Sequence, residues 1–179
     1  MISEDSTSIE RISESLIFLV GFMGAGKSTV GRLLAEKLSY RFIDLDALIE
    51  EQTGRSIKAI FVESGEGEFR RLEREAIESC GKLERSVIAL GGGAYISEEN
   101  RTLLRSLGKT VWLDCPLGIC LTRVAGDRSR PLLGKEGGMR VLFKMRRPMY
   151  ALADYHVETG TLPAKYVVRA VIDLLGSQP

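Results

Sequence analysis

Histidine and cysteine are scarce in this chain, and their scarcity excludes several kinds of site. A single histidine, His156, excludes a histidine-rich metal centre, and we expect it in a strand rather than in a catalytic role. The three cysteines, Cys80, Cys115 and Cys120, are odd in number and form no C-x-x-C pair. This pattern indicates neither a disulfide framework nor a zinc site, so we expect three buried, reduced thiols.

Long apolar runs and an excess of one charge are also lacking. No run approaches the roughly 20 apolar residues of a membrane-spanning helix. Residues 1–15 are polar and contain acidic side chains, unlike a signal or transit peptide, so we expect a disordered tail there and a cytoplasmic protein. With 25 Lys and Arg against 24 Asp and Glu, the formal net charge of +1 gives no general reason to expect a nucleic-acid or membrane partner.

What the chain does have is a glycine-rich motif directly after its first apolar run, at 16–20. Residues 21–28 fit the pattern G-x-x-x-x-G-K-[ST]. Between a strand and a helix, such a loop binds phosphate through its backbone N–H groups and the positive end of the helix. We expect Lys27 to reach the outer phosphates and the Ser28 hydroxyl to ligate Mg²⁺. A dinucleotide-binding loop fits poorly, because Thr29 stands where its third glycine belongs.

Strands and helices alternate along the rest of the chain. The expected strands lie at about 16–20, 40–43, 86–90, 110–113 and 155–157. Helical patterns run from 27, from 46 with breaks at 53–54 and 64–67, over 97–107 and 116–125, from about 139, and over 163–175. Alternation of this kind predicts an α/β fold, a five-stranded parallel sheet covered by helices on both faces. Combined with the phosphate loop, it predicts the three-layer P-loop NTPase fold.

Further candidate residues follow the predicted strands. Asp44 and Asp46 end the second strand and should face the ligand crevice at its carboxyl edge. Gly91–Gly93 follow the third, where three glycines would let a ligand touch the backbone, although a flexible turn is an equal alternative. Arg70 and Glu73 lie three apart on a helix, a spacing that also suits a solvated ion pair.

A basic, glycine-bounded segment, 126–138, is too long for an ordinary connection. We therefore expect a mobile lid at about 125–138, which would close over bound ligands. Beyond it, Pro148 is expected to kink or end the helix that begins near residue 139.

Taken together, these motifs resemble shikimate kinase over roughly residues 16–176. The resemblance rests on six segments in this order: the phosphate loop 21–28, Asp44-Leu45-Asp46, Phe69-Arg70-Arg71-Leu72-Glu73, Gly91-Gly92-Gly93, Arg130-Pro131-Leu132-Leu133, and Arg146-Arg147-Pro148-Met149-Tyr150. The phosphate loop alone is shared by many unrelated nucleotide-binding proteins, whereas all six in order are specific. The resemblance implies one domain over 16–179, a monomer that uses ATP and Mg²⁺ to phosphorylate the 3-hydroxyl of shikimate on the way to chorismate and the aromatic amino acids.

The resemblance also implies roles for individual residues. The catalytic set is Asp46 at the substrate hydroxyl, Lys27 and the lid residue Arg130. The nucleotide set is Gly24, Ala25, Gly26, Lys27, Ser28, Thr29, Arg123, which stacks on adenine, and Arg130. The shikimate set is Asp46, the ring-walling Phe61 and Phe69, the carboxylate-binding Arg70 and Arg146, Glu73, which orients Arg70, and Gly91, Gly92 and Gly93. Mg²⁺ is held by Ser28 and, through water, by Asp44.

The chemistry of the reaction favours these residue types independently. Phosphoryl transfer has a loose, highly charged transition state, which cations neutralise. The planar fork of arginine suits a carboxylate better than lysine does. One departure from the family is the segment 157–163, which lacks the basic residue that many members place near adenine, so base contacts on that side stay open.

Three other functions compete with this interpretation. A gluconate-kinase-like enzyme shares the small P-loop fold but does not explain the paired acids, the glycine triplet and the two arginines. A GTP-dependent switch requires an N-K-x-D motif, which the chain lacks. A non-catalytic shikimate-binding relative would have lost residues at the reacting centre, whereas Asp46, Lys27, Arg70, Arg130 and Arg146 are all present.

Overall fold

The computed structural model describes residues 16–125 and 136–177. The predictions made for the tail at 1–15 and for Arg130 with most of the lid fall outside these ranges. Among the described residues, no helix is long and apolar enough to cross a membrane.

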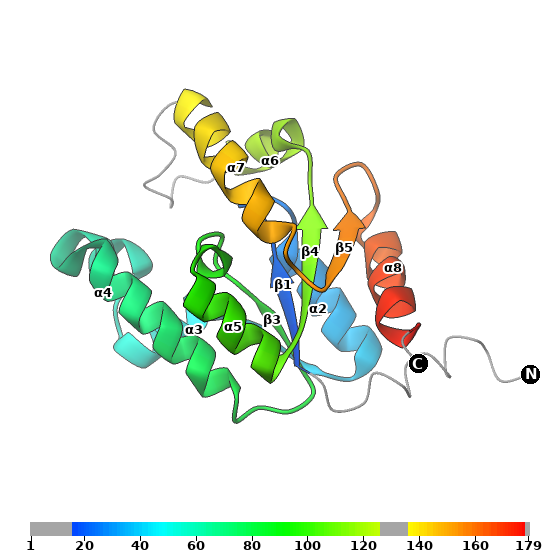
Figure 1. The fold of residues 1–179 in the computed structure, drawn as a ribbon, viewed down its shortest axis with the longest axis horizontal. Coiled ribbons are helices and arrows are strands. Elements are labelled where there is room, and N and C mark those ends of the chain that lie inside the picture. Colours follow the sequence, from blue (N-terminus) through cyan, green and yellow to red (C-terminus); the bar gives the residue numbers. More distant parts are fainter. Residues whose placement is uncertain (1–15, 126–135, 178–179) are drawn as a thin grey trace, which may run out of the picture.

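A five-stranded parallel sheet forms the centre of the fold (Figure 1). Its strands are β1 (Leu16–Val20), β2 (Arg41–Asp44), β3 (Ser86–Ala89), β4 (Gly108–Asp114) and β5 (Tyr155–Glu158). They are hydrogen bonded in the order β2-β3-β1-β4-β5, and every pair is parallel. The predicted α/β fold is confirmed, with strand ends that differ from the predictions by one or two residues.

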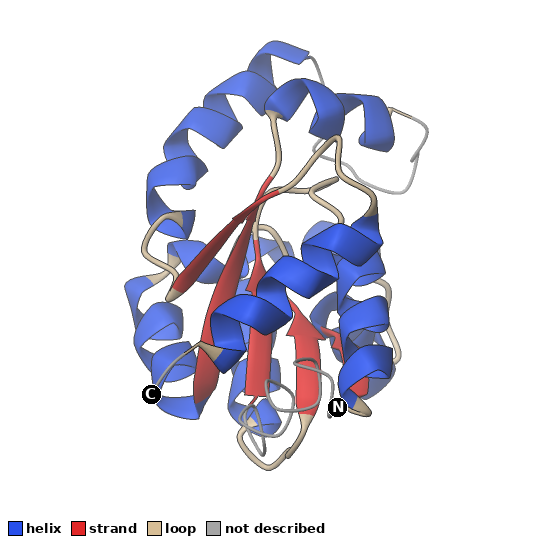
Figure 2. Cartoon of the chain, turned by 90° about the vertical axis from the view of Figure 1, so that its right-hand side faces the viewer, coloured by secondary structure: helices blue, strands red, loops and turns tan. Residues whose placement is uncertain are grey.

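Helices cover both faces of this sheet (Figure 2). They are α2 (Lys27–Leu38), α3 (Leu45–Thr53), α4 (Ile57–Cys80), the 3-10 turn η1 (Ala94–Ile96), α5 (Glu98–Leu107), α6 (Leu117–Val124), α7 (Glu136–Tyr150) and α8 (Ala164–Gly176). On one face α2 and α8 contact each other, and on the other α4 packs on α5, which contacts β4. The sheet is thus the middle layer of three.

The core explains why β1 reads as an unbroken apolar run. All five of its residues are buried, because parallel strands at the centre of a three-layer sheet meet helices on both faces. On the α2 side the packing is close at Gly31, where an added Cβ would lie 2.5 Å from the Phe42 ring. The three cysteines are buried and unpaired, and His156 lies in β5, as predicted.

Two helices differ from their predictions. The break expected at 64–67 is a kink within α4, where Gly65 has φ 80° and ψ 177° and helical residues continue on both sides. Glycine reaches such a conformation without a Cβ clash. Pro148 lies inside α7, which ends two residues later at Tyr150, so proline is accommodated in the last turn.

Candidate active site

The phosphate loop connects β1 to α2 and depends on its glycines. Gly24 has φ 76°, and a Cβ there would lie 2.7 Å from the Cys120 carbonyl oxygen. Gly26 is the residue before α2 and adopts the left-handed conformation with φ 97°. Both positions favour glycine, which has no Cβ to clash. The loop therefore delivers the chain into α2 with the helix N-terminus facing the pocket described below.

Lys27, the first residue of α2, folds across this loop. Its ammonium group donates hydrogen bonds to the carbonyl oxygens of Gly21 at 2.8 Å and Phe22 at 3.0 Å. These contacts hold the charge over the loop, next to the backbone N–H groups at the start of the helix. The arrangement concentrates positive charge where an anion such as phosphate would bind.

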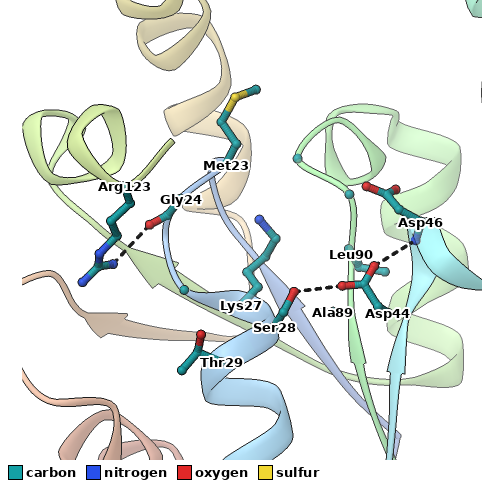
Figure 3. Close-up of a pocket in the computed structure, with 13 residues that line it drawn as sticks. Met23, Gly24, Lys27, Ser28, Thr29, Asp44, Asp46, Ala89, Leu90 and Arg123 are labelled. Carbon is teal, nitrogen blue, oxygen red and sulfur yellow. Dashed lines mark hydrogen bonds between the residues drawn. The ribbon is translucent and has the colours of Figure 1, made fainter. Parts of the chain in front are cut away.

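Asp44 and Ser28 meet at the carboxyl edge of the sheet (Figure 3). The Ser28 hydroxyl donates to Asp44 Oδ2 at 2.8 Å, while Asp44 Oδ1 accepts from the backbone N–H groups of Asp46 at 3.2 Å and Ala47 at 3.5 Å. Asp44 is thus the N-cap of α3, which fixes the direction of its carboxylate. Asp46 follows in the first turn of the same helix and faces the same pocket.

The pocket has a volume of about 260 Å³. It is lined by Met23, Gly24, Gly26, Lys27, Ser28, Thr29, Asp44, Asp46, Ala89, Leu90, Gly91, Gly92 and Arg123. Most of the residues predicted for the nucleotide, both residues predicted for the metal, and part of the glycine triplet therefore share one cavity. Met23, Ala89 and Leu90 were not predicted as lining residues, because apolar side chains beside a loop carry no pattern that sets them apart from the core.

The glycine triplet packs against charged side chains from three segments. A Cβ at Gly91 would lie 2.8 Å from Asp46 Oδ1 and 3.4 Å from Glu73 Oε1. Both carboxylates therefore lie close to the side of Gly91 where another residue would carry its side chain. This close approach gives Gly91 a structural reason beyond a flexible turn, the alternative that the sequence left open.

The next two glycines approach the arginines. A Cβ at Gly93 would lie 2.5 Å from Arg70 Nη1, and one at Gly92 would lie 3.5 Å from Arg146 Nη1. Arg70 comes from α4 and Arg146 from α7. The triplet is therefore the point at which the acceptor residues predicted from distant segments come together.

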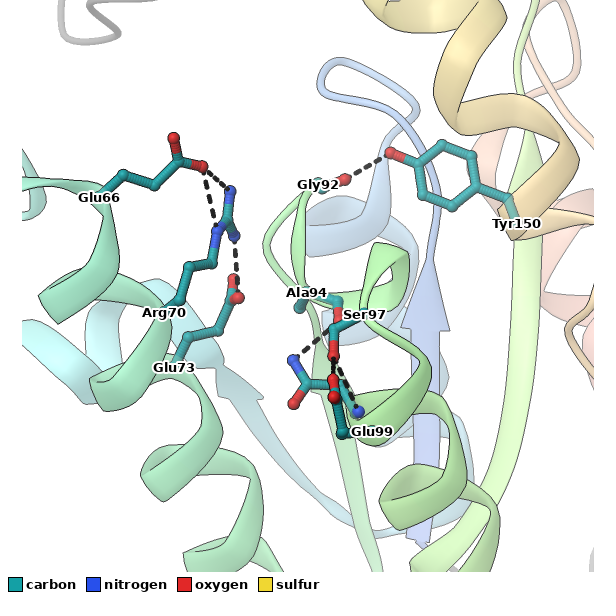
Figure 4. A network of polar contacts seen from close by, with 9 residues as sticks. Glu66, Arg70, Glu73, Gly92, Ala94, Ser97, Glu99 and Tyr150 are labelled. Atoms are coloured by element: carbon teal, nitrogen blue, oxygen red, sulfur yellow. Dashed lines mark hydrogen bonds and ion pairs between the residues drawn. The ribbon is translucent and has the colours of Figure 1, made fainter.

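Arg70 is held by two glutamates of unequal burial (Figure 4). Its Nη1 donates to Glu73 Oε2 at 2.8 Å, and its Nε and Nη2 donate to Glu66 Oε1 at 3.3 and 3.1 Å. The Glu73 side chain is 1% exposed and that of Glu66 is 68% exposed. The sequence left open that Arg70 and Glu73 form a solvated ion pair. This alternative is wrong, because the Glu73 carboxylate is buried.

Burial governs the charges in this cluster. Loss of solvent raises the pKa of Glu73, and the positive charge and hydrogen bond of Arg70 only partly oppose it. Burial also disfavours the charge on Arg70, but the two glutamates outweigh it and raise its pKa, so the guanidinium remains charged. Glu73 Oε1 has no hydrogen-bond partner among the described residues and faces the triplet.

Two phenylalanines of α4 lie beside this cluster. The rings of Phe61 and Phe69 are 4.7 Å apart with an interplanar angle of 33°. The Arg70 guanidinium lies 5.2 Å from the centre of the Phe69 ring. The pair thus forms an apolar surface next to the predicted carboxylate-binding arginine.

Arg123, on α6, connects the phosphate loop to the segment after β5. Its Nη1 donates to the Gly24 carbonyl oxygen at 3.1 Å, and its Nη2 donates to that of Gly160 at 2.8 Å. Its guanidinium lines the pocket from the side opposite Asp46 (Figure 3). The segment 157–163, which lacks a basic residue, is therefore joined to the nucleotide side by Arg123.

Arg147 and Tyr150, near the end of α7, make contacts that were not predicted. Arg147 donates to Asp114 Oδ2 at 2.7 Å and lies 5.3 Å from the centre of the Trp112 ring. On β5, His156 stacks on the same indole at 4.5 Å. The Tyr150 hydroxyl donates a hydrogen bond to the carbonyl oxygen of Gly92. Its only signal in the sequence was the place of Tyr150 in the last of the six resembling segments.

A phosphate loop at the start of α2, carboxylates at the sheet edge and arginines on the far side of the glycine triplet define a P-loop kinase of the small-molecule type. Comparison with known proteins specifies the family, because the family described as Shikimate kinase matches residues 23–176. The chain therefore belongs to the shikimate kinase family.

Individual relatives agree with this assignment. A shikimate kinase of Geobacter sulfurreducens is 48% identical over 158 residues, which cover 87% of both chains. The solved structure of shikimate kinase from Acinetobacter baumannii in complex with shikimate superposes with a TM-score of 0.87 at 38% identity, over 94% of this chain and 96% of that one. The protein is thus an enzyme, a kinase whose family reaction is the ATP-dependent phosphorylation of shikimate, as predicted.

The competing functions are set aside on the same grounds. A gluconokinase from Sinorhizobium meliloti superposes with a TM-score of only 0.57 at 18% identity, over 90% of this chain and 91% of that one. This likeness shows a shared fold and nothing further. Because the chain belongs to a family of kinases, the other two alternatives, a GTP-dependent switch and a non-catalytic binding protein, are also set aside.

Proposed function

We propose that the described pocket and the glycine triplet together form the site at which the γ-phosphoryl group of ATP passes to the 3-hydroxyl of shikimate. The position of Asp46 carries this proposal. Asp46 lines the phosphate-loop pocket and also lies beside Gly91, where an added Cβ would be 2.8 Å from its Oδ1 and 3.4 Å from Glu73 Oε1. A carboxylate placed between the pocket and the glycine triplet can reach a terminal phosphate on one side and an acceptor hydroxyl on the other.

On the donor side, the residues implied by the family resemblance surround the phosphates. The loop N–H groups and the N-terminus of α2 bind phosphate oxygens, and Lys27 moves from the carbonyl groups of Gly21 and Phe22 to the outer phosphates. Arg123 is proposed to stack on the adenine ring. Arg130, which lies outside the described residues, is proposed as the lid arginine that adds positive charge in the transition state.

The donor atoms near the phosphate loop fit Mg²⁺. The Ser28 hydroxyl donates a hydrogen bond to the Asp44 carboxylate at 2.8 Å, and Ser28 lies in the first turn of α2. No group of three His, Cys, Asp or Glu in the described ranges could enclose a metal by itself. Magnesium in kinases keeps several waters and is held by one or two protein oxygens together with phosphates, which matches this pair. When bound, the ion would neutralise charge on the transferring phosphoryl group.

On the acceptor side, two arginines bind the shikimate carboxylate. Arg70 and Arg146 converge on the glycine triplet from α4 and α7, and each offers a bidentate fork. Buried Glu73 fixes the direction of Arg70 through the 2.8 Å hydrogen bond. Phe61 and Phe69 wall the ring of the substrate, whose other face meets the bare backbone of the triplet.

Asp46 then acts on the reacting hydroxyl. Its carboxylate accepts the proton of the 3-hydroxyl as the oxygen attacks the γ-phosphorus, and ADP leaves along the opposite direction. The proton remains on Asp46 until the product departs. We further propose that the protein has no nucleic-acid or membrane partner, since its charges balance at +1 overall. That it works as a cytoplasmic monomer is part of the same proposal and rests on the family resemblance.

A coupled ADP-release assay with three acceptors tests this function. Shikimate, quinate and gluconate are supplied separately at equal concentrations with ATP and Mg²⁺. We expect rapid ADP release with shikimate and much slower rates with the other two acceptors, because quinate lacks the ring double bond and gluconate is an open chain with no ring to place against Phe61 and Phe69. Equal rates with all three acceptors would refute the proposed acceptor site.

A further inference from the structure

Tyr150 is buried at the end of α7 and contacts both the glycine triplet and Arg146. Tyr150 is 1% exposed, and its hydroxyl donates a hydrogen bond to the Gly92 carbonyl oxygen (Figure 4). We propose that Tyr150 is a positioning residue for the acceptor, whose hydroxyl holds the glycine triplet and Arg146 in register so that both meet the substrate. The proposal rests on the acceptor site described under Proposed function.

The direction of the hydrogen bond follows from the groups involved. A carbonyl oxygen can only accept, so the phenolic proton points at Gly92. The lone pairs of the phenolic oxygen are then available to the guanidinium of Arg146, which can only donate. Burial raises the pKa of Tyr150 to about 12, while the charge of Arg146 and its hydrogen bond to the phenolic oxygen act in the opposite direction. The hydroxyl stays protonated in the ordinary working range of pH.

The three groups form a closed arrangement. Arg146 and Tyr150 lie four residues apart on α7 and thus on the same face of the helix. Gly92 lies against Arg146, since a Cβ there would be 3.5 Å from its Nη1. The carbonyl oxygen of the same glycine is held by Tyr150. One hydroxyl therefore sets both the place of the backbone that faces the substrate ring and the orientation of the arginine proposed for its carboxylate.

The ring and the hydroxyl of Tyr150 do different things. The ring packs beside Trp112, with centroids 6.4 Å apart, and contributes to the core whether or not the oxygen is present. The hydroxyl adds no apolar contact and makes its hydrogen bonds only toward the site. Removal of the oxygen alone should therefore change substrate binding more than stability.

The test is Tyr150→Phe, with Tyr166→Phe as the matched control. Tyr166 is 56% exposed on α8 and is not among the residues that line the pocket. For Tyr150→Phe we expect the KM for shikimate to rise about tenfold, the scale of a lost hydrogen bond to a charged group, while the KM for ATP stays within about twofold. The control should match the parent protein in both constants. An unchanged KM for shikimate, or equal rises for both substrates, overturns the proposal.

A double-mutant cycle with Arg146→Lys supplies a second test that a purely structural role would fail. If Tyr150 acts through Arg146, the effect of Tyr150→Phe on the KM for shikimate should shrink to less than about threefold in the Arg146→Lys background. Full additivity of the two effects contradicts the proposal even if Tyr150→Phe lowers the melting temperature. Failure of the parent protein to phosphorylate shikimate would instead refute the proposed function, so the two failures are distinguishable.

Discussion

The two halves of the site differ in how ready they are for their ligands. On the donor side, the loop, Lys27, Ser28 and Asp44 hold one another through hydrogen bonds of 2.8 to 3.0 Å within the pocket. On the acceptor side, the Nε and Nη2 edge of Arg70 is already bonded to Glu66. In the donor half only neutral carbonyl groups compete with an anion for Lys27, whereas in the acceptor half a carboxylate already occupies one edge of Arg70.

The place of Glu66 explains why this carboxylate is easy to exchange. Glu66 follows Gly65, which carries the non-helical angles of the α4 kink, and precedes Gly67. Its side chain is 68% exposed, so its bond to Arg70 is a solvated ion pair of small net value. Glu73 is buried and cannot leave in the same way. We infer that the substrate carboxylate replaces Glu66 and leaves the pair of Arg70 with Glu73 intact.

The largest expected effect comes from Asp46, which both halves share. Asp46→Asn should lower kcat by about 100-fold or more, because an amide cannot accept the hydroxyl proton. Nucleotide affinity should be nearly unchanged, since the donor half keeps its contacts. Steady-state kinetics and calorimetric titration with ADP measure the two quantities, and Asp173→Asn on the surface of α8 is the control. A kcat close to that of the parent protein would remove Asp46 from the reaction.

A smaller effect is expected from Arg70→Lys, which should weaken binding to the acceptor half and leave the donor half unchanged. Arg70→Lys keeps the charge but loses the fork, so shikimate binding should weaken by about 1.5–3 kcal/mol while ATP binding is preserved. Arg71→Lys on the same helix is a matched control, because Arg71 pairs with exposed glutamates away from the site. Calorimetry with shikimate is the measurement. Equal weakening in both variants, or none in Arg70→Lys, would contradict the comparison.

The smallest effect should have the opposite sign. Glu66→Gln removes the competing carboxylate, so shikimate should bind about two- to fivefold more tightly, the scale of an exposed ion pair. Salt should reduce this gain, because exposed charges are screened. Glu68→Gln is the control, since Glu68 pairs with Arg71 in the same segment. Weaker binding in Glu66→Gln would show that Glu66 assists the substrate instead of competing with it.

The phosphate loop of the donor half was predictable because its residues are contiguous in sequence. Its glycines, Lys27 and Ser28 stand within eight residues, and their spacing alone defines the geometry of the loop. The central strands β1 and β3 were predictable from their local sequence, since every residue of both is buried and each belongs to a short, mostly apolar run. Roles given to Arg130 and to the lid stay predictions, because those residues lie outside the described part of the chain.

The acceptor half was harder to predict because tertiary packing decides it. Arg70–Glu73 and Arg71–Glu68 are both pairs three residues apart on one helix, yet the glutamate is 1% exposed in the first pair and 32% exposed in the second. Local spacing cannot distinguish the two. The hydrogen bond from Tyr150 to Gly92 joins residues 58 positions apart, and no periodicity within α7 predicts it. Residue patterns singled out the glycine triplet and the Arg70–Glu73 pair only with equal alternatives, and the family resemblance was needed to assign them to the acceptor half.

The stack on Trp112 gives the protein a natural optical probe of α7. Trp112 is the only tryptophan of the chain, so its fluorescence is a single signal. The emission of an indole responds to nearby cationic and aromatic groups, and here the Arg147 guanidinium lies 5.3 Å from the ring centre while His156 stacks at 4.5 Å. Arg147 adjoins Arg146, so a shift of α7 on shikimate binding should change the emission. Rapid mixing of unlabelled protein with shikimate should thus time the arrival of this ligand.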